Sequence, residues 1–135
     1  MEGQEPQTSA ANAHAAAPLR YRCPISGFQK ICGGKHKLRI LWALRKGPLA
    51  FGDLKRASSV FSEFAMAPRV FTRELKHVQE SGLVERRAAP GPGARVEYRM
   101  TALGATMVPL LDAICRWSLD NLDIAPPDDG ACVDI

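Results

Sequence analysis

The sequence predicts a mainly α-helical fold that carries one small β-hairpin. Apolar residues recur at helical spacing through most of the chain, and glycine or proline closes most of these stretches. Between residues 95 and 100 the pattern changes, because apolar residues there alternate strictly with charged ones, as in a half-buried strand. A Pro-Gly-Pro-Gly run at 90–93 precedes this strand and predicts a turn that connects it to an earlier strand at 83–88.

Five helices are predicted from their start and stop signals. Pro24 suits the first position of a helix, where its missing N–H costs nothing, and Gly82 suits a helix end. Thr101 is a good N-cap for the last helix, which contains Pro109 and is expected to bend there. Residues 59–64 are either a turn or an extra helical turn. The first predicted helix begins at Pro24 and ends at the Gly33-Gly34 break. The other four predicted helices span residues 35–46, 52–58, 67–81 and 102–122.

The length of 135 residues fits one domain with tails. We expect a disordered arm at 1–19, the folded domain at 20–123 and a flexible acidic tail at 124–135. The first residues lack the charged and apolar segments of a secretory signal, and no apolar run approaches the ~20 residues that cross a bilayer. The 4 cysteines match no zinc spacing, so neither a metal nor a cofactor is expected. A reducing cytoplasm is the predicted location, with no membrane partner.

The basic residues are concentrated in the middle of the chain. Residues 30–99 hold 15 of the 18 Lys and Arg but only 6 of the 14 Asp and Glu, so this part carries +9 while the whole chain carries +4. A basic domain with acidic ends is typical of a protein that binds a polyanion. The alternative is a basic surface that serves only solubility.

The helix at 67–81 places its polar residues on one face. Positions 69, 72, 73 and 76 project together when Phe71 and Leu75 hold the helix to the core. Such a basic helix followed by a β-ribbon is the layout of a winged helix, whose helix enters the major groove of double-stranded DNA. The candidate DNA-binding residues on this face are Arg69, Thr72, Arg73 and Lys76.

The expected DNA partner of each side chain follows from its chemistry. Arg69 and Arg73 are expected to contact bases, Thr72 a thymine methyl group, and Lys76 the backbone. The hairpin and the preceding helix add candidates for the minor groove and for phosphates. These further candidates are Arg87, Arg95, Lys55 and Arg56.

The last helix carries a longer apolar stripe than one small domain needs to cover. We therefore expect this helix to pack against a second copy of the chain; the alternative is that the stripe only closes its own core. The expected dimer-interface residues are Leu110, Leu111, Ile114, Trp117 and Leu122.

With these features in order, the chain resembles the HxlR-type winged helix-turn-helix regulators of bacteria. The resemblance covers roughly residues 23–122. It departs from the usual family pattern at His36, where Trp is common, at Ala67, where Ser is common, and in a longer connection at Ser58–Ala65. The motifs that carry it are Cys23-Pro24, ICGGKHKLRILWAL, FGDL, LKHVQESGLVERR, ARVEYRMTALG and PLLDAICRWS. The resemblance implies a homodimer that binds operator DNA and whose terminal helices form the dimer contact.

Cys23 immediately precedes the first helix. A helix N-terminus favours a thiolate, and Arg20 and Arg22 add positive charge nearby. The resemblance implies a cysteine at this position that senses oxidants or electrophiles, which makes Cys23 the candidate sensor. The alternative is a partly buried structural cysteine.

The expected function is therefore that of a homodimeric, sequence-specific DNA-binding transcriptional regulator, a repressor, that recognises an inverted-repeat operator. An oxidant acting through Cys23 is one expected inducer. A small molecule bound in a pocket at the dimer interface is the alternative inducer. A function of another class is a winged-helix protein-interaction module without specific DNA binding. An enzyme is not expected, because no nucleophile–base pair, phosphate loop or ligand cluster stands out in the sequence.

Overall fold

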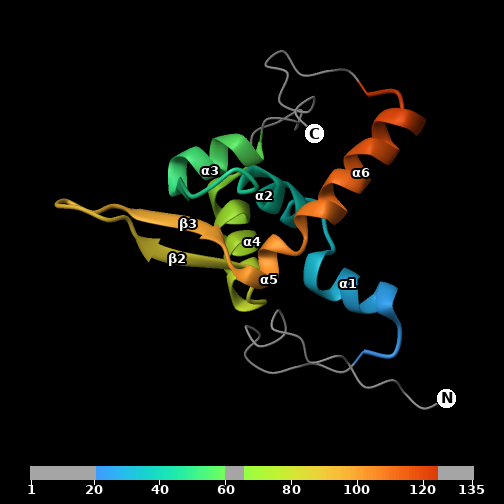
Figure 1. The fold of residues 1–135 in the computed structure, drawn as a ribbon, viewed down its shortest axis with the longest axis horizontal. Coiled ribbons are helices and arrows are strands. Elements are labelled where there is room, and N and C mark those ends of the chain that lie inside the picture. The colour runs from blue at the N-terminus through green and yellow to red at the C-terminus, as the bar shows by residue number, and fades with distance from the viewer. Residues whose placement is uncertain (1–20, 60–65, 125–135) are drawn as a thin grey trace.

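The computed structural model describes residues 21–59 and 66–124. Within these ranges the chain forms six helices and one three-stranded antiparallel sheet (Figure 1). The expected arm at 1–19, the segment at 60–65 and nearly all of the tail expected at 124–135 lie outside the described residues. The elements are α1 (Pro24–Cys32), α2 (Lys37–Ala43), β1 (Leu49–Ala50), α3 (Phe51–Ser58), α4 (Pro68–Glu80), β2 (Val84–Ala88), β3 (Val96–Met100), α5 (Ala102–Ala105) and α6 (Val108–Asn121).

The predicted hairpin is confirmed as β2 and β3. Val84 pairs with Met100 and Arg86 with Tyr98, so the apolar residues of β3 share one face with the buried start of β2. The structure adds the two-residue strand β1, which pairs with the other edge of β3 and gives the order β1-β3-β2. Strand β1 was not predicted, because two residues are too few to show an alternating pattern.

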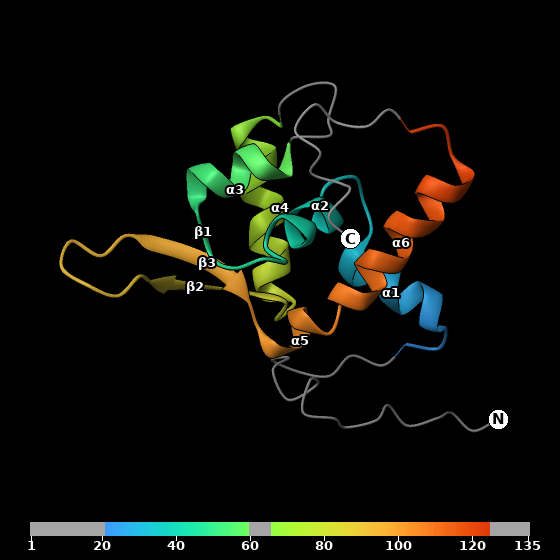
Figure 2. The ribbon, with the colours of Figure 1, turned by 45° about the horizontal axis from the view of Figure 1, so that its top comes forward.

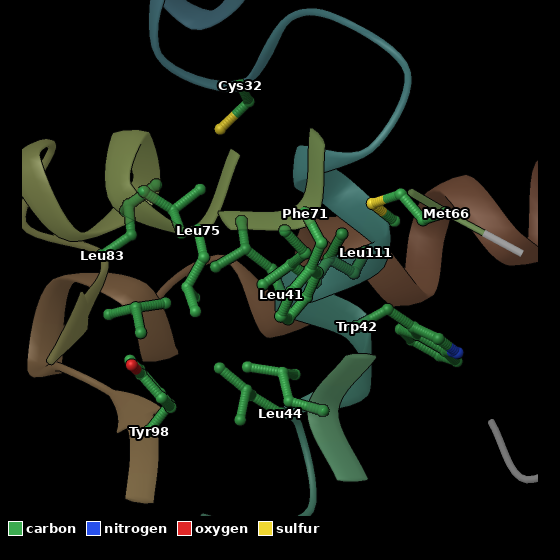
Figure 3. Close-up of a cluster of buried hydrophobic side chains, with 14 residues drawn as sticks. Cys32, Leu41, Trp42, Leu44, Met66, Phe71, Leu75, Leu83, Tyr98 and Leu111 are labelled. Carbon is green, nitrogen blue, oxygen red and sulfur yellow. The ribbon is translucent and has the colours of Figure 1, made fainter. Parts of the chain in front are cut away.

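The core lies between α2, α3, α4 and the sheet. Figure 3 shows Leu41 of α2 and Phe71 and Leu75 of α4 in one cluster of buried side chains. Helix α2 is surrounded by the core on more than one side, since its consecutive residues Ile40, Leu41 and Trp42 are all buried. Burial of these side chains supplies the main favourable free energy of folding.

The long last helix was predicted wrongly. The structure divides it into α5 and α6, and a two-residue turn at Thr106-Met107 separates them. Pro109 lies in the first turn of α6 and does not bend a continuous helix. The physical reason is that proline has no N–H to donate to the preceding turn and its ring crowds that turn, so a helix starts there more easily than it continues.

The predicted N-cap at Thr101 is confirmed. The Thr101 hydroxyl accepts a hydrogen bond from the N–H of Gly104 at 3.0 Å and donates one to the carbonyl of Gly82. Thr101 therefore ties the start of α5 to the turn that follows α4.

Helices α1 and α6 lie on the side of the molecule opposite to the hairpin and α3, with α4 between the two sides (Figures 1 and 2). Large apolar side chains are exposed on α1 and α6. Leu111 is a correction to the expected dimer surface, because it is 3% exposed and belongs to the core of its own chain. Its position on the inner side of α6 turns it toward α2. The exposed large apolar residues on this side are Ile25, Leu110, Ile114, Trp117, Leu119, Leu122 and Ile124.

Candidate nucleic-acid interface

Helix α4 has a buried apolar face and an exposed basic face. Pro68 occupies its first turn, and Phe71, Leu75 and Val78 are buried on one side. The structure exposes all four candidates that the sequence analysis placed on the other side. We call this set the reading face; it consists of Arg69, Thr72, Arg73 and Lys76. A helix of ordinary diameter with an exposed basic face fits the major groove of DNA.

Glu74 is a residue of this helix that the sequence analysis missed. It is 7% exposed, and its carboxylate oxygens contact two cations: Lys37 Nζ lies 2.9 Å from Oε1 and Arg73 Nε lies 3.2 Å from Oε2. Lys37 Nζ also donates a hydrogen bond to the carbonyl oxygen of Gly33 at 3.2 Å. A signal was present in the sequence, because position 74 falls on the buried face with Phe71 and Val78, and a buried acid needs a partner.

These contacts set the charge state of Glu74. Burial raises the pKa of its carboxyl, but the hydrogen bonds from Lys37 and Arg73 act in the opposite direction and leave the pKa below its ordinary value. Glu74 therefore remains an anion, and both of its neighbours remain paired with it at neutral pH.

Helix α3 packs against α2 and lies on the same side of the molecule as the hairpin (Figure 2). Arg56 is exposed and pairs with Asp53 one turn earlier, whereas Lys55 is half-buried. An ion pair between two exposed side chains contributes little to stability, so Arg56 can exchange Asp53 for a phosphate at small cost.

The register of the hairpin divides its arginines between two faces. Arg86 pairs with Tyr98, whose ring contacts Phe51 of α3, so Arg86 lies on the sheet face that the helices cover. Arg87 lies on the opposite face with Glu85, which contacts Arg99 at 2.7 Å and Arg87 at 3.8 Å. Arg86 is exposed and was not among the predicted residues; counting in twos from the buried Val84 indicates its face. Arg95 is exposed directly before β3.

Two of the cysteines have opposite environments. Cys23 is exposed at the N-cap of α1, and the backbone N–H and hydroxyl of Ser26, then the N–H of Ile25, lower the pKa of its thiol. Burial instead raises the pKa of Cys32 to about 11. The predicted position of Cys23 at a helix N-terminus is confirmed, and Cys32 packs in the core at the other end of the same helix.

His36 lies at the N-cap of α2, close to Glu74. Burial lowers the pKa of its imidazole, and Arg39 lowers it further, while Glu74 acts against both. Its Nδ1 atom is buried and has no hydrogen-bond partner among the described residues. This environment favours the neutral form of His36.

The part of the chain that the structure describes contains no helix long and apolar enough to span a bilayer. The same residues contain no group of three or more His, Cys, Asp or Glu arranged to hold a metal ion.

Comparison with known proteins agrees with this geometry. The sequence profile of the HxlR-like helix-turn-helix family matches residues 31–125. An HTH-type transcriptional regulator of Methanothermobacter thermautotrophicus is 34% identical over 97 residues, which cover 72% of this chain and 70% of that protein. The HTH-type transcriptional regulator YdzF of Bacillus subtilis is 29% identical over 99 residues, or 73% of this chain and 86% of YdzF.

Solved structures show the same fold. A transcriptional regulator of the MarR family from Porphyromonas gingivalis has a TM-score of 0.65 and 28% identity, and the match covers 78% of this chain and 99% of that one. The redox regulator HypR in its oxidized form also has a TM-score of 0.65, with 24% identity over 76% of this chain and all of HypR. The chain thus belongs to the HxlR-like helix-turn-helix family and is a helix-turn-helix transcriptional regulator with a winged DNA-binding fold.

Proposed function

We propose that the protein is a homodimeric regulator that binds an inverted-repeat operator sequence-specifically and represses transcription. The observation that carries this proposal is the reading face, whose four polar side chains are exposed together while the opposite side of α4 is buried. A repressor of this kind acts by occupying the operator, and the proposal includes no catalytic step. Its place of action is the cytoplasm.

The residues have separate roles in this proposal. Arg69 and Arg73 contact base edges, since a guanidinium can donate two hydrogen bonds to one guanine, and Thr72 contacts a thymine methyl group. Lys76 meets the phosphate backbone and contributes affinity without sequence preference.

The wing, which is the hairpin of β2 and β3, and helix α3 extend the contact on either side of α4. Arg87 and Arg95 of the wing, joined by Arg86 on the helix-covered face, approach the minor groove. Lys55 and Arg56 of α3 contact phosphates.

The dimer in this proposal forms through the sides of α1 and α6 that face away from the hairpin. Ile25, Leu110, Ile114, Trp117 and Leu122 are exposed there in one chain, and large apolar side chains in solvent favour association. A two-fold dimer presents two copies of the reading face, which matches an inverted repeat with half-sites about one helical turn apart.

An oxidant controls DNA binding in this proposal, and Cys23 is its sensor. The exposed thiol with a lowered pKa supports this role, because the thiolate is the reactive form. The solved structures with the same fold include the redox regulator HypR and the transcriptional regulator YodB in a diamide-treated form.

The test is a fluorescence anisotropy titration of the reduced protein on DNA from upstream of its own gene, with excess nonspecific DNA present. We expect tight binding that Arg69→Ala weakens and that mild oxidation abolishes in the wild type but not in Cys23→Ser. Loss of binding on oxidation in both proteins would remove Cys23 as the sensor. Binding that survives oxidation but responds to an aromatic small molecule would favour the dimer-interface pocket. Absence of any preference over competitor DNA would contradict the proposed function.

A further inference from the structure

Helix α4 contains a buried acidic residue, Glu74, beside the reading face. Glu74 directly follows Arg73 and places a negative charge within contact distance of the reading face. An anion there is unfavourable on two counts, since burial opposes its charge and DNA phosphates repel it. A glutamate that served only packing would be better replaced by an apolar residue. Its paired contacts indicate a different role.

The contact with Arg73 engages one particular atom of the guanidinium. Arg73 donates to Glu74 through Nε at 3.2 Å, and this leaves the two terminal amino groups, Nη1 and Nη2, for a second acceptor. The Arg73 side chain is still 58% exposed. Two parallel N–H donors at the end of an arginine match the O6 and N7 acceptors of guanine. A carboxylate bound at Nε therefore orients the side chain without occupying the donors that would contact a base.

The contact with Lys37 holds the carboxylate itself in place. Lys37 Nζ lies 2.9 Å from Glu74 Oε1, and its side chain is 14% exposed. The same ammonium donates to the carbonyl oxygen of Gly33, the C-cap residue that follows α1. Because one of these two contacts is to the main chain, the position of Lys37 is fixed by the fold and not only by the ion pair.

We propose that Glu74 is a positioning residue that orients the Arg73 guanidinium for base recognition and that Lys37 holds Glu74 for this task. The proposal deepens the proposed function and rests on it. Glu74 itself does not contact DNA. Glu74 restricts the conformations of the Arg73 side chain in the free protein, so Arg73 loses less conformational entropy when it binds DNA. A smaller entropy loss increases affinity for the matching base pair.

The proposal and simple electrostatics make opposite predictions for Glu74→Gln. Removal of a negative charge beside DNA strengthens binding to every sequence when charge alone matters. If Glu74 positions Arg73, the same substitution weakens binding to the operator by about 10-fold and relaxes preference at one base pair of each half-site. Glu80→Gln is the matched control, since it removes the same charge from an exposed position on the last turn of α4. It should leave base preference unchanged.

The decisive measurement is a double-mutant cycle between Glu74→Gln and Arg73→Ala. Anisotropy titrations would be made on the operator and on operators substituted at each position in turn. If Glu74 acts through Arg73, Glu74→Gln causes no further loss in the Arg73→Ala protein. An equal loss in both backgrounds, or an unchanged operator affinity and base preference in the single variant, would overturn the proposal.

A second variant covers the case in which Glu74→Gln does not fold. Replacing both members of the pair, Lys37→Met with Glu74→Met, fills the same space with apolar groups, and such replacements often preserve stability. This protein should melt near the wild-type temperature and still lose preference at the Arg73 base pair. Retained preference would mean that the pair is only structural. A wild-type protein that shows no operator preference at all would contradict the proposed function itself, and this inference with it.

Discussion

Two thiols of this chain differ in reactivity because of where each lies on α1. Cys23 is exposed at the N-cap with a lowered pKa, whereas Cys32 is 2% exposed at the other end of the helix and its pKa is raised to about 11. We expect iodoacetamide at pH 7 to modify Cys23 rapidly and Cys32 only on unfolding, because alkylation requires an accessible thiolate. Peptide mass spectrometry over time would measure the alkylation rate of each of the two cysteines. Equal rates in the folded protein would contradict the assignment.

His36 gives the protein a predictable response to acid. The folded state lowers the pKa of His36, so the unfolded state takes up a proton first as the pH falls. The stability that depends on neutral His36 is therefore complete above the ordinary histidine pKa of about 6.5 and decreases as the pH falls below it. Urea unfolding midpoints should drop between pH 7.5 and 5.5 in the wild type and drop less in His36→Phe. Equal slopes in the two proteins would exclude His36 as the cause.

Single residues were predictable where their role depends on neighbours in sequence. The exposure of Arg69 and Lys76 followed from helical spacing, and the cap at Thr101 followed from residue type. Glu74 was missed because its partner Lys37 lies in another helix, and spacing along one helix carries no information about a contact between two.

The packing of α5 against the start of β2 depends on one glycine. A Cβ atom added to Gly104 would lie 2.0 Å from the carbonyl oxygen of Leu83, so α5 can approach the start of β2 only when residue 104 lacks a side chain. Gly104→Ala should lower the free energy of unfolding by about 2 kcal/mol, the scale of overpacking a close contact. Gly52→Ala is the matched control. Its added Cβ meets nothing within 4 Å and lies in helix α3, so a small gain in stability is expected. Chemical denaturation of both variants would test the pair.

At the level of elements, the hairpin and the first four helices were predictable, but the end of the chain was not. A helical pattern of apolar residues continues through 102–122, so periodicity alone gives no sign of the turn at Thr106-Met107. Pro109 was the available signal, and a proline is compatible with a helix start as well as with a bend. Strand β1 needs β3 as a partner and has no signature of its own.

The whole molecule has two sides with different chemistry. The hairpin and α3 lie on the side away from α1 and α6, and α4 lies between the two sides (Figures 1 and 2). Most of the exposed large apolar residues belong to α1, α6 and the residues directly after α6. Under the proposed function, this arrangement lets one chain bind DNA on one side and a second chain on the other, without competition between the two partners. Helical spacing predicted the exposed basic face of α4, and the apolar stripe of the last helix predicted the exposed apolar residues except for Leu111.

The proposed dimer can be tested with two residues of the same helix. Trp117 is 59% exposed in one chain, so Trp117→Glu should leave the fold intact and convert the dimer to a monomer, since a buried charge opposes association. Leu111→Ala should instead lower the free energy of unfolding by about 2–5 kcal/mol, as for other core leucines. Sedimentation velocity and thermal melting of both variants would measure the two effects. A Trp117→Glu protein that remains dimeric would place the interface elsewhere.

The turn at Thr106-Met107 has a consequence for how such regulators diverge. It separates α6 from α5, and only the inner side of α6 joins the core, so the exposed side of α6 can change its residues without any change in the helix and hairpin proposed to contact DNA. Under the proposed dimer, duplicated copies of the gene can therefore stop forming mixed pairs through a few substitutions on α6 while both retain the ancestral operator. The DNA-contacting residues of each copy can then change independently, so each copy can acquire new target promoters.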